Sequence, residues 1–168
     1  AHTSLVRQLQ TREMSRVYQA LASGDLAGKG TVDAPIGRHP RDRKRMAVVA
    51  SGKPAVSHYR SLKRFGDATH VEVSLESGRT HQIRVHMAHI GHPLIGDPVY
   101  GHKPRAPSAV TEMQFEAMRA FPRQALHAYR LSLVHPDGSG AVTFEAPLPE
   151  DMVKLLSCLR NNEDMGSE

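Results

Sequence analysis

Some segments of the chain repeat their hydrophobic residues with the period of a helix, and others repeat them with the period of a strand. Ile83, Met87 and Ile90 recur at i, i+4 and i+7, which predicts a helix with one apolar side. Thr80 is a suitable N-cap for this helix, and Gly91 is a suitable end. Three further segments have helical patterns, namely residues 3–13, 111–119 and 150–162.

Segments with the alternation and composition of strands separate these helices. Gly66 and Asp67 lie between two of them and predict an antiparallel hairpin. Because strands and helices do not alternate regularly, we expect an α+β fold with a mixed, mainly antiparallel sheet flanked by helices. We expect one domain over residues 1–160 and a frayed tail over 161–168. The predicted strands are residues 15–22, 31–36, 54–65, 68–77, 125–136 and 141–147.

The charge of the chain favours a polyanionic partner. Its 168 residues include 22 Lys and Arg against 17 Asp and Glu, and the sequence pI is near 9.7. No periodicity survives over residues 37–45, so we expect a loop there. Five of the eight residues from 38 to 45 are basic, a density suited to a phosphate backbone. An ordinary solvated loop remains the alternative. The basic residues of this stretch are Arg38, Arg41, Arg43, Lys44 and Arg45.

The same patterns exclude several classes of protein. No apolar run approaches the ~18 residues of a membrane span, and no signal-peptide core is present, so we expect a cytoplasmic protein without a membrane partner. The single cysteine, Cys158, excludes an internal disulfide and is expected to be buried in the last helix.

Residues 76–101 carry the densest set of chemically active side chains. The helical period places Arg84 next to the apolar side, where a permanent charge is costly unless it pairs with a carboxylate or a phosphate. A functional pairing and a structural salt bridge both remain open. Arg79 lies in the turn before the helix and is expected in solvent, where it is a further candidate for RNA contact.

The histidines of this segment raise the question of a metal site. His86, His89 and His92 recur every three residues, whereas paired zinc ligands on a helix usually stand at i and i+4. Gly91 and Pro93 also end the helix before His92 can align with the others. We therefore expect no metal, and phosphate contacts or structural roles for the histidines.

Residues 78–101, GRTHQIRVHMAHIGHPLIGDPVYG, closely resemble the signature segment of the pseudouridine synthases that modify large-subunit ribosomal RNA. The resemblance continues, in the expected order, in SRVYQAL (15–21), GTVDAPIGRHP (30–40), GKPAVSHYR (52–60) and RQALHA (123–128). It implies an enzyme whose aspartate opens the chemistry on a flipped-out uridine, after which the base detaches, rotates and rejoins the sugar through carbon. It implies no cofactor, and ribosomal RNA as the partner.

The resemblance also assigns roles to individual residues. It makes Tyr18 the tyrosine that stacks on the target base, and Arg84 the arginine that pairs with the catalytic aspartate. Leu126 corresponds to an apolar residue packed against the site, and His81 and Gln82 to supporting residues.

One part of the family pattern is missing, because the aspartate lies in a motif like HRLDxxTSG and no such string occurs here. We expect that motif upstream of this chain, so the chain alone should be inactive while the intact parent, expected to be a monomer, is active. A non-catalytic RNA-binding module and a histidine-rich metalloprotein are the alternatives. The aspartates that stand in other contexts are Asp25, Asp33, Asp42, Asp67 and Asp97.

Overall fold

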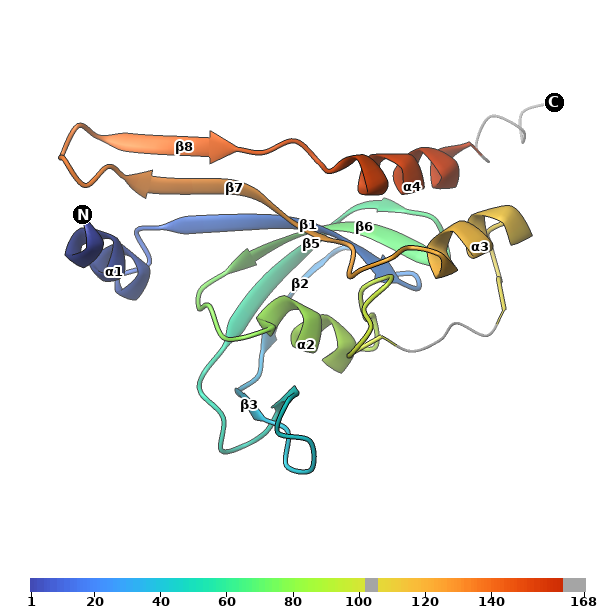
Figure 1. The fold of residues 1–168 in the computed structure, drawn as a ribbon, viewed down its shortest axis with the longest axis horizontal. Helices are drawn as coiled ribbons and strands as arrows, with labels where there is room; N and C mark the ends of the chain where they lie inside the picture. The colour runs from blue at the N-terminus through green and yellow to red at the C-terminus, as the bar shows by residue number, and fades with distance from the viewer. Residues whose placement is uncertain (102–105, 162–168) are drawn as a thin grey trace.

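The structure, a computed structural model, describes residues 1–101 and 106–161, which form four helices and eight strands (Figure 1). Of the predicted tail, residues 162–168 lie outside the described residues. In chain order the elements are α1 (His2–Gln10), β1 (Ser15–Ser23), β2 (Lys29–Asp33), β3 (Ile36–Arg38), β4 (Met46–Val48), β5 (Val56–Arg64), β6 (Ala68–Leu75), α2 (Gln82–His89), α3 (Glu112–Arg119), β7 (Leu126–Val134), β8 (Ala141–Glu145) and α4 (Glu150–Arg160).

Six of these strands form one sheet in the order β2-β5-β6-β1-β7-β8, and every neighbouring pair is antiparallel. β5 and β6 are joined at Gly66, whose φ of 90° suits a glycine in a tight turn. The predicted α+β fold with a mainly antiparallel sheet flanked by helices is therefore confirmed.

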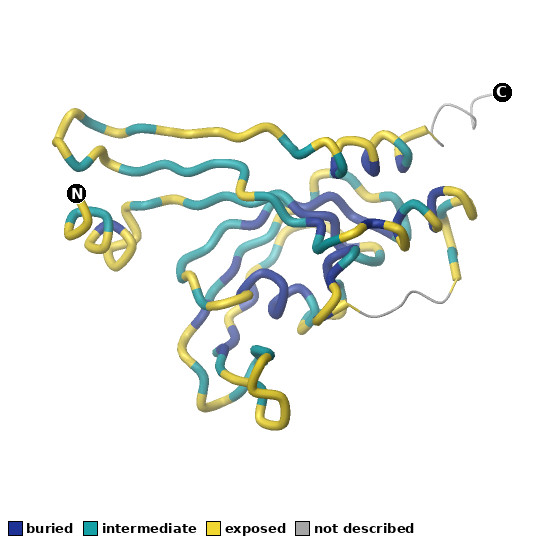
Figure 2. Tube along the Cα trace, in the orientation of Figure 1, coloured by how far each residue is buried: buried dark blue, intermediate teal, exposed yellow. Residues whose placement is uncertain are grey.

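Helices cover both faces of the sheet, and the central strand β1 contributes to both cores. Successive side chains of a strand point to opposite faces. Ala20 accordingly packs with Ile83 and Met87 of α2, whereas Leu21 packs with Met152 of α4. Figure 2 shows the buried residues concentrated along α2 and the middle of the sheet, away from the long β7-β8 end. The apolar side predicted for α2 is thus the side that covers the sheet.

The short strands β3 and β4 form a separate hairpin, which we call the basic hairpin (residues 36–48). Ile36 packs in a small core with Val85 of α2 and with Tyr100, and this contact attaches the hairpin to the helix. The loop predicted for residues 37–45 is wrong at its start, because Gly37 and Arg38 belong to β3. Pairing with β4 supplies the backbone hydrogen bonds that the local pattern does not indicate.

α2 begins one residue later than its sequence indicates, and Thr80 is not its N-cap. The N-cap is His81, which takes a left-handed conformation with φ of 56° and makes no side-chain capping bond. The side chain of Gln82 folds back on the turn before the helix, where its Oε1 accepts a hydrogen bond from the backbone N–H of Arg79.

The two terminal helices complete the fold. Gln8 of α1 is buried and exchanges two hydrogen bonds with the backbone of Val134, at 2.7 and 2.8 Å, so α1 is attached to the end of β7. Cys158 in α4 is half-buried rather than buried, because α4 presents only one side to the core.

Candidate active site and RNA-binding surface

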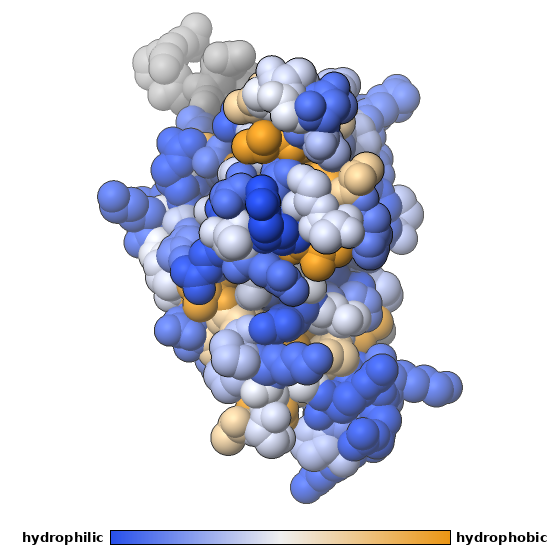
Figure 3. Space-filling view, turned by 90° about the vertical axis from the view of Figure 1, so that its left-hand side faces the viewer, coloured by the Kyte–Doolittle hydropathy of each residue, from blue (hydrophilic) through white to orange (hydrophobic). Residues whose placement is uncertain are grey.

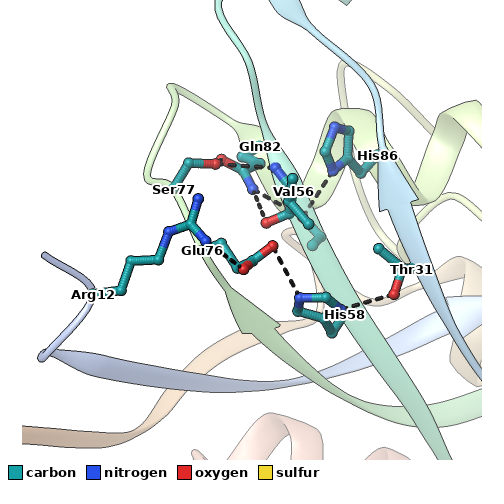
Figure 4. A network of polar contacts seen from close by, with 9 residues as sticks. Arg12, Thr31, Val56, His58, Glu76, Ser77, Gln82 and His86 are labelled. Atoms are coloured by element: carbon teal, nitrogen blue, oxygen red, sulfur yellow. Dashed lines mark hydrogen bonds and ion pairs between the residues drawn. The ribbon is translucent and has the colours of Figure 1, made fainter. Parts of the chain in front are cut away.

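Gln82 attaches the first turn of α2 to the sheet, and this fixes the direction in which the helix presents its other side chains. Its Nε2 donates to the carbonyl of Val56 at 2.9 Å and to the hydroxyl of Ser57 at 3.0 Å. Its Oε1 accepts from the Ser77 hydroxyl at 2.8 Å, as Figure 4 shows. With every polar atom of a buried amide paired, the helix start has one defined position.

Arg84 lies two residues further along α2 and forms a buried ion pair with Asp97. Its Nε donates to Oδ2 at 2.8 Å and its Nη2 donates to Oδ1 at 2.9 Å. The side chains are 10% and 0% exposed. A turn at Gly96 aims the carboxylate, and a Cβ there would collide with the carbonyl of Arg123.

The local hydrogen bonds keep both partners charged. Burial alone would raise the pKa of Asp97, but hydrogen bonds from Arg84 and from the backbone N–H groups of Tyr100 and Val99 outweigh it and lower that pKa. The bond to Asp97 in turn raises the pKa of Arg84. Within residues 1–101 and 106–161, Nη1 of Arg84 donates to no acceptor. The guanidinium is therefore fixed along one edge and retains donors for a second acidic group.

Tyr100 connects this ion pair to the basic hairpin. Its ring centroid lies 5.0 Å from the guanidinium carbon of Arg84 and 5.5 Å from that of Arg45. Its hydroxyl accepts from the backbone N–H of Met46 at 3.0 Å and lies 2.8 Å from Nδ1 of His81. Burial, followed by the charge of Arg84, lowers the pKa of His81, which agrees with a neutral ring that accepts the tyrosine hydrogen.

Tyr18 and Leu126 lie together on the face of the sheet that α2 covers. Both pack against the core cluster that contains Ile83 and Met87, the neighbours of Arg84 on α2. Tyr18 also lines a surface pocket together with Ala128. The structure thus brings the predicted tyrosine and leucine to the helix that carries the predicted arginine.

The basic residues of the hairpin lie at its tip, which is ordered by its own hydrogen bonds. His39 Nδ1 accepts from the backbone N–H groups of Arg41 and Asp42, both at 3.1 Å. Arg38, Arg41, Arg43 and Lys44 are exposed, whereas Arg45 is half-buried against Tyr100. In Figure 3 the lower end of the molecule, where Figure 1 places this hairpin, is strongly hydrophilic.

Two further predictions concern Arg79 and the histidines. Arg79 is half-buried rather than fully in solvent, because its Nε donates to the carbonyl of Pro54 at 2.9 Å. His86 is fully buried, with Nδ1 2.8 Å from the Ser57 hydroxyl and Nε2 donating to the carbonyl of Ala34 at 2.9 Å, so its role is structural. In the part of the chain that the structure describes, no three His, Cys, Asp or Glu side chains stand together as metal ligands.

Sequence reasoning missed Asp97 and Tyr100. Asp97 does not stand in the family's aspartate motif, and no motif or period marks Tyr100. A signal for the ion pair existed, since Asp97 is the single acidic residue between Glu76 and Gly101 and Arg84 in the same segment requires a carboxylate.

Residues 1–89, more than half of the chain, match the model of the RNA pseudouridylate synthase family. The chain belongs to this family, whose members are RNA-modifying isomerases, and the resemblance inferred from the sequence is confirmed.

Within the family, the chain is similar to the ribosomal large subunit pseudouridine synthases D. It is 56% identical over 164 residues to that of Pseudomonas aeruginosa, covering 98% of this chain and 51% of the relative. It is 52% identical over 160 residues to that of Escherichia coli K12, covering 95% of this chain and 49% of the relative. The chain therefore spans about half the length of these relatives.

Two solved human structures have the same fold. Human RNA pseudouridylate synthase domain containing 1 is 26% identical with a TM-score of 0.68, covering 94% of this chain and 70% of that structure. Human RNA pseudouridylate synthase domain containing 4 is 25% identical with a TM-score of 0.72, covering 94% and 67%. No helix in the described residues is long and apolar enough to cross a membrane.

Proposed function

We propose that this chain is the arginine- and tyrosine-bearing part of an enzyme that isomerises uridines of large-subunit ribosomal RNA to pseudouridine. The observation that carries the proposal is the buried guanidinium of Arg84, fixed by Asp97 along one edge only, in a chain 56% identical to a synthase D. Such an enzyme acts where ribosomes are assembled, which for a bacterial relative is the cytoplasm.

In this proposal Arg84 orients the catalytic aspartate. The resemblance to the family places that aspartate in a motif which this sequence does not contain. Its carboxylate would accept from Nη1 of Arg84, which Asp97 leaves available. A carboxylate held in this way stays ionised and keeps the direction of attack, and positioning of this kind can account for a large share of a rate enhancement.

The remaining residues position the substrate. Tyr18 stacks on the flipped-out uridine and Leu126 packs beside it, as their shared cluster on the α2 face supports. His81 and Gln82 keep α2 in place through Tyr100 and Val56. The exposed arginines and lysine of the basic hairpin contact phosphates of the RNA, and no cofactor takes part in the reaction.

The test measures pseudouridine formation in a large-subunit ribosomal RNA transcript. The proteins are this chain, the chain extended upstream to the length of its relatives, and the extended protein with Arg84→Lys. We expect activity in the extended protein alone, and a loss of about 100-fold in the variant, because lysine keeps the charge and loses the bidentate fork. Arg64→Lys is the matched control, since Arg64 makes a bidentate contact with Asp25 on the surface.

Two results would contradict the proposal. Pseudouridine formed by the 168-residue chain alone would show that the nucleophile lies within it. RNA binding without activity in the extended wild-type protein would favour a non-catalytic RNA-binding module.

A further inference from the structure

A pocket of about 410 Å³ opens between the end of α1, the start of β1 and the turn that leads into α2. Arg12, Arg16 and Arg79 line it. No residue of the basic hairpin does, so this is a second concentration of positive charge on the molecule. Only Arg79 was a candidate from the sequence.

Arg16 has the most unusual environment of the three. Its Nε is buried and makes no hydrogen bond within the described residues, although buried N–H groups are nearly always paired. Its guanidinium lies over Gly78, where an added Cβ would stand 2.5 Å from Nη1. The absence of a side chain at Gly78 therefore gives the Arg16 guanidinium its place at the pocket.

The pocket keeps an excess of positive charge. Glu76 is its single carboxylate among the described residues, and it is already bound by Arg12 at 2.9 Å and approached by His58 Nε2 at 3.2 Å, as Figure 4 shows. Within residues 1–101 and 106–161, the Arg79 side chain donates a hydrogen bond through its Nε alone, to the carbonyl of Pro54. Arg16 and the outer nitrogens of Arg79 thus face the pocket without a neutralising carboxylate of their own.

We propose that this pocket binds a backbone phosphate of the RNA substrate, with Arg16 as its principal ligand. Guanidinium groups match the geometry of phosphate oxygens, and a polyanion offers such groups in series. Arg16 and Tyr18 are two positions apart on β1, so they share a face of the strand about 7 Å apart. The pocket therefore lies beside the tyrosine proposed to stack on the target base. The identity of the polyanion as RNA rests on the proposed function.

The test uses equilibrium binding of the 168-residue chain to a large-subunit ribosomal RNA fragment over a range of salt concentrations. Gly78→Ala is the decisive variant, because it displaces the Arg16 guanidinium without changing the charge of the protein. We expect it to weaken binding about 5-fold, and Arg16→Gln to weaken binding about 10-fold and to reduce the slope of log K against log salt by roughly 0.7 to 1. Arg119→Gln on α3, an exposed arginine paired with Glu116, should change neither quantity.

Thermal unfolding of each variant shows whether the fold is retained, and the outcomes separate the alternatives. If Arg16→Gln and Arg119→Gln weaken RNA binding equally and Gly78→Ala has no effect, then the net charge of the protein alone explains the binding. That result would overturn the proposed phosphate site. Unchanged RNA binding together with a lower unfolding temperature of the upstream-extended Arg16→Gln protein would identify a protein carboxylate as the occupant, which also overturns the proposal. If the pocket variants behave as expected while the extended protein forms no pseudouridine, the pocket stands and the proposed function fails.

Discussion

Arg84 shows what a buried charge contributes to this molecule. An ion pair removed from water contributes little net stability, because desolvation of both charges offsets most of their attraction. Loss of one partner, in contrast, costs about 3–5 kcal/mol, since the other charge is left buried. The bidentate contact with Asp97 therefore matters chiefly for direction: it allows the guanidinium one orientation, with one nitrogen left for a further acceptor.

Tyr18, Leu126 and Arg84 could be chosen from the sequence, because each stands in a motif whose period or family pattern marks it. The partner of Arg84 could not be chosen in the same way. Asp97 follows Arg84 by 13 positions, across the helix end and a glycine turn, and local periodicity says nothing about contacts beyond such a turn. Arg16 could not be singled out from the sequence, because the lack of a hydrogen-bond partner for its Nε among the described residues is a property of the fold.

His70 gives the protein a predicted pH dependence. It is buried, and its Nε2 lies 2.8 Å from Oε1 of Gln19. Burial, and next the charge of Arg160, lower its pKa to about 4, although Glu72 acts in the opposite direction. Unfolded histidine titrates near pH 6.5, so between about pH 6.5 and 4 the unfolded state binds the additional proton. The free energy of unfolding should therefore fall as the pH decreases through this window.

The measurement is urea unfolding at several pH values from about 7 to 4, with His70→Gln as the variant. Glutamine does not titrate and can still bond to Gln19, so this variant should lose less stability on acidification than the wild type. A smaller dependence will remain, because burial also lowers the pKa of His86. Parallel curves for the two proteins would show that His70 does not contribute.

Among the elements, the basic hairpin depends on a residue that lies outside it. β3 and β4 have three residues each, too few for stability without a partner. The Tyr100 hydroxyl binds the backbone N–H of Met46 at the start of β4, and the Tyr100 ring packs with Ile36. This dependence explains why the sequence predicts a loop for residues 37–45. The residues of that segment do not reveal that Tyr100, more than 50 positions away, stabilises the strands.

Tyr100→Phe tests that dependence. The ring remains, but the Met46 N–H loses its acceptor, at a cost of about 1–3 kcal/mol. We expect faster hydrogen exchange in the hairpin, at the amides of His39 and Arg45, and unchanged exchange in α4. Tyr59→Phe is the control, since in the described part of the chain the Tyr59 hydroxyl makes no hydrogen bond. Equal protection of the hairpin in both variants would show that packing alone stabilises it.

For the whole molecule, the sequence predicts the pairing of strands that follow one another in the chain better than the pairing of strands that are distant in sequence. The hairpin β5-β6 follows from Gly66 and Asp67, and the hairpin β7-β8 from the turn at residues 137–140, because their turns are local. The placement of β1 between β6 and β7 depends on contacts between residues at least 45 positions apart. These contacts are specified by packing on both faces, which no single segment encodes.

Because β1 contributes to the cores on both faces of the sheet, we expect the described elements to unfold as one unit. Leu21 is fully buried on the α4 side, while its neighbours Ala20 and Ala22 are fully buried on the α2 side. Leu21→Ala should lower the free energy of unfolding by about 2–5 kcal/mol through the cavity that it leaves. Val153→Ala, at a 45% exposed position of α4, should cost far less. Far-UV circular dichroism follows all helices. Tyrosine fluorescence reports on four tyrosines, of which Tyr18, Tyr59 and Tyr100 lie on the α2 side, so coincident urea transitions are expected in both variants. Separate transitions in Leu21→Ala would show instead that α3 and α4 unfold independently of the site-bearing face.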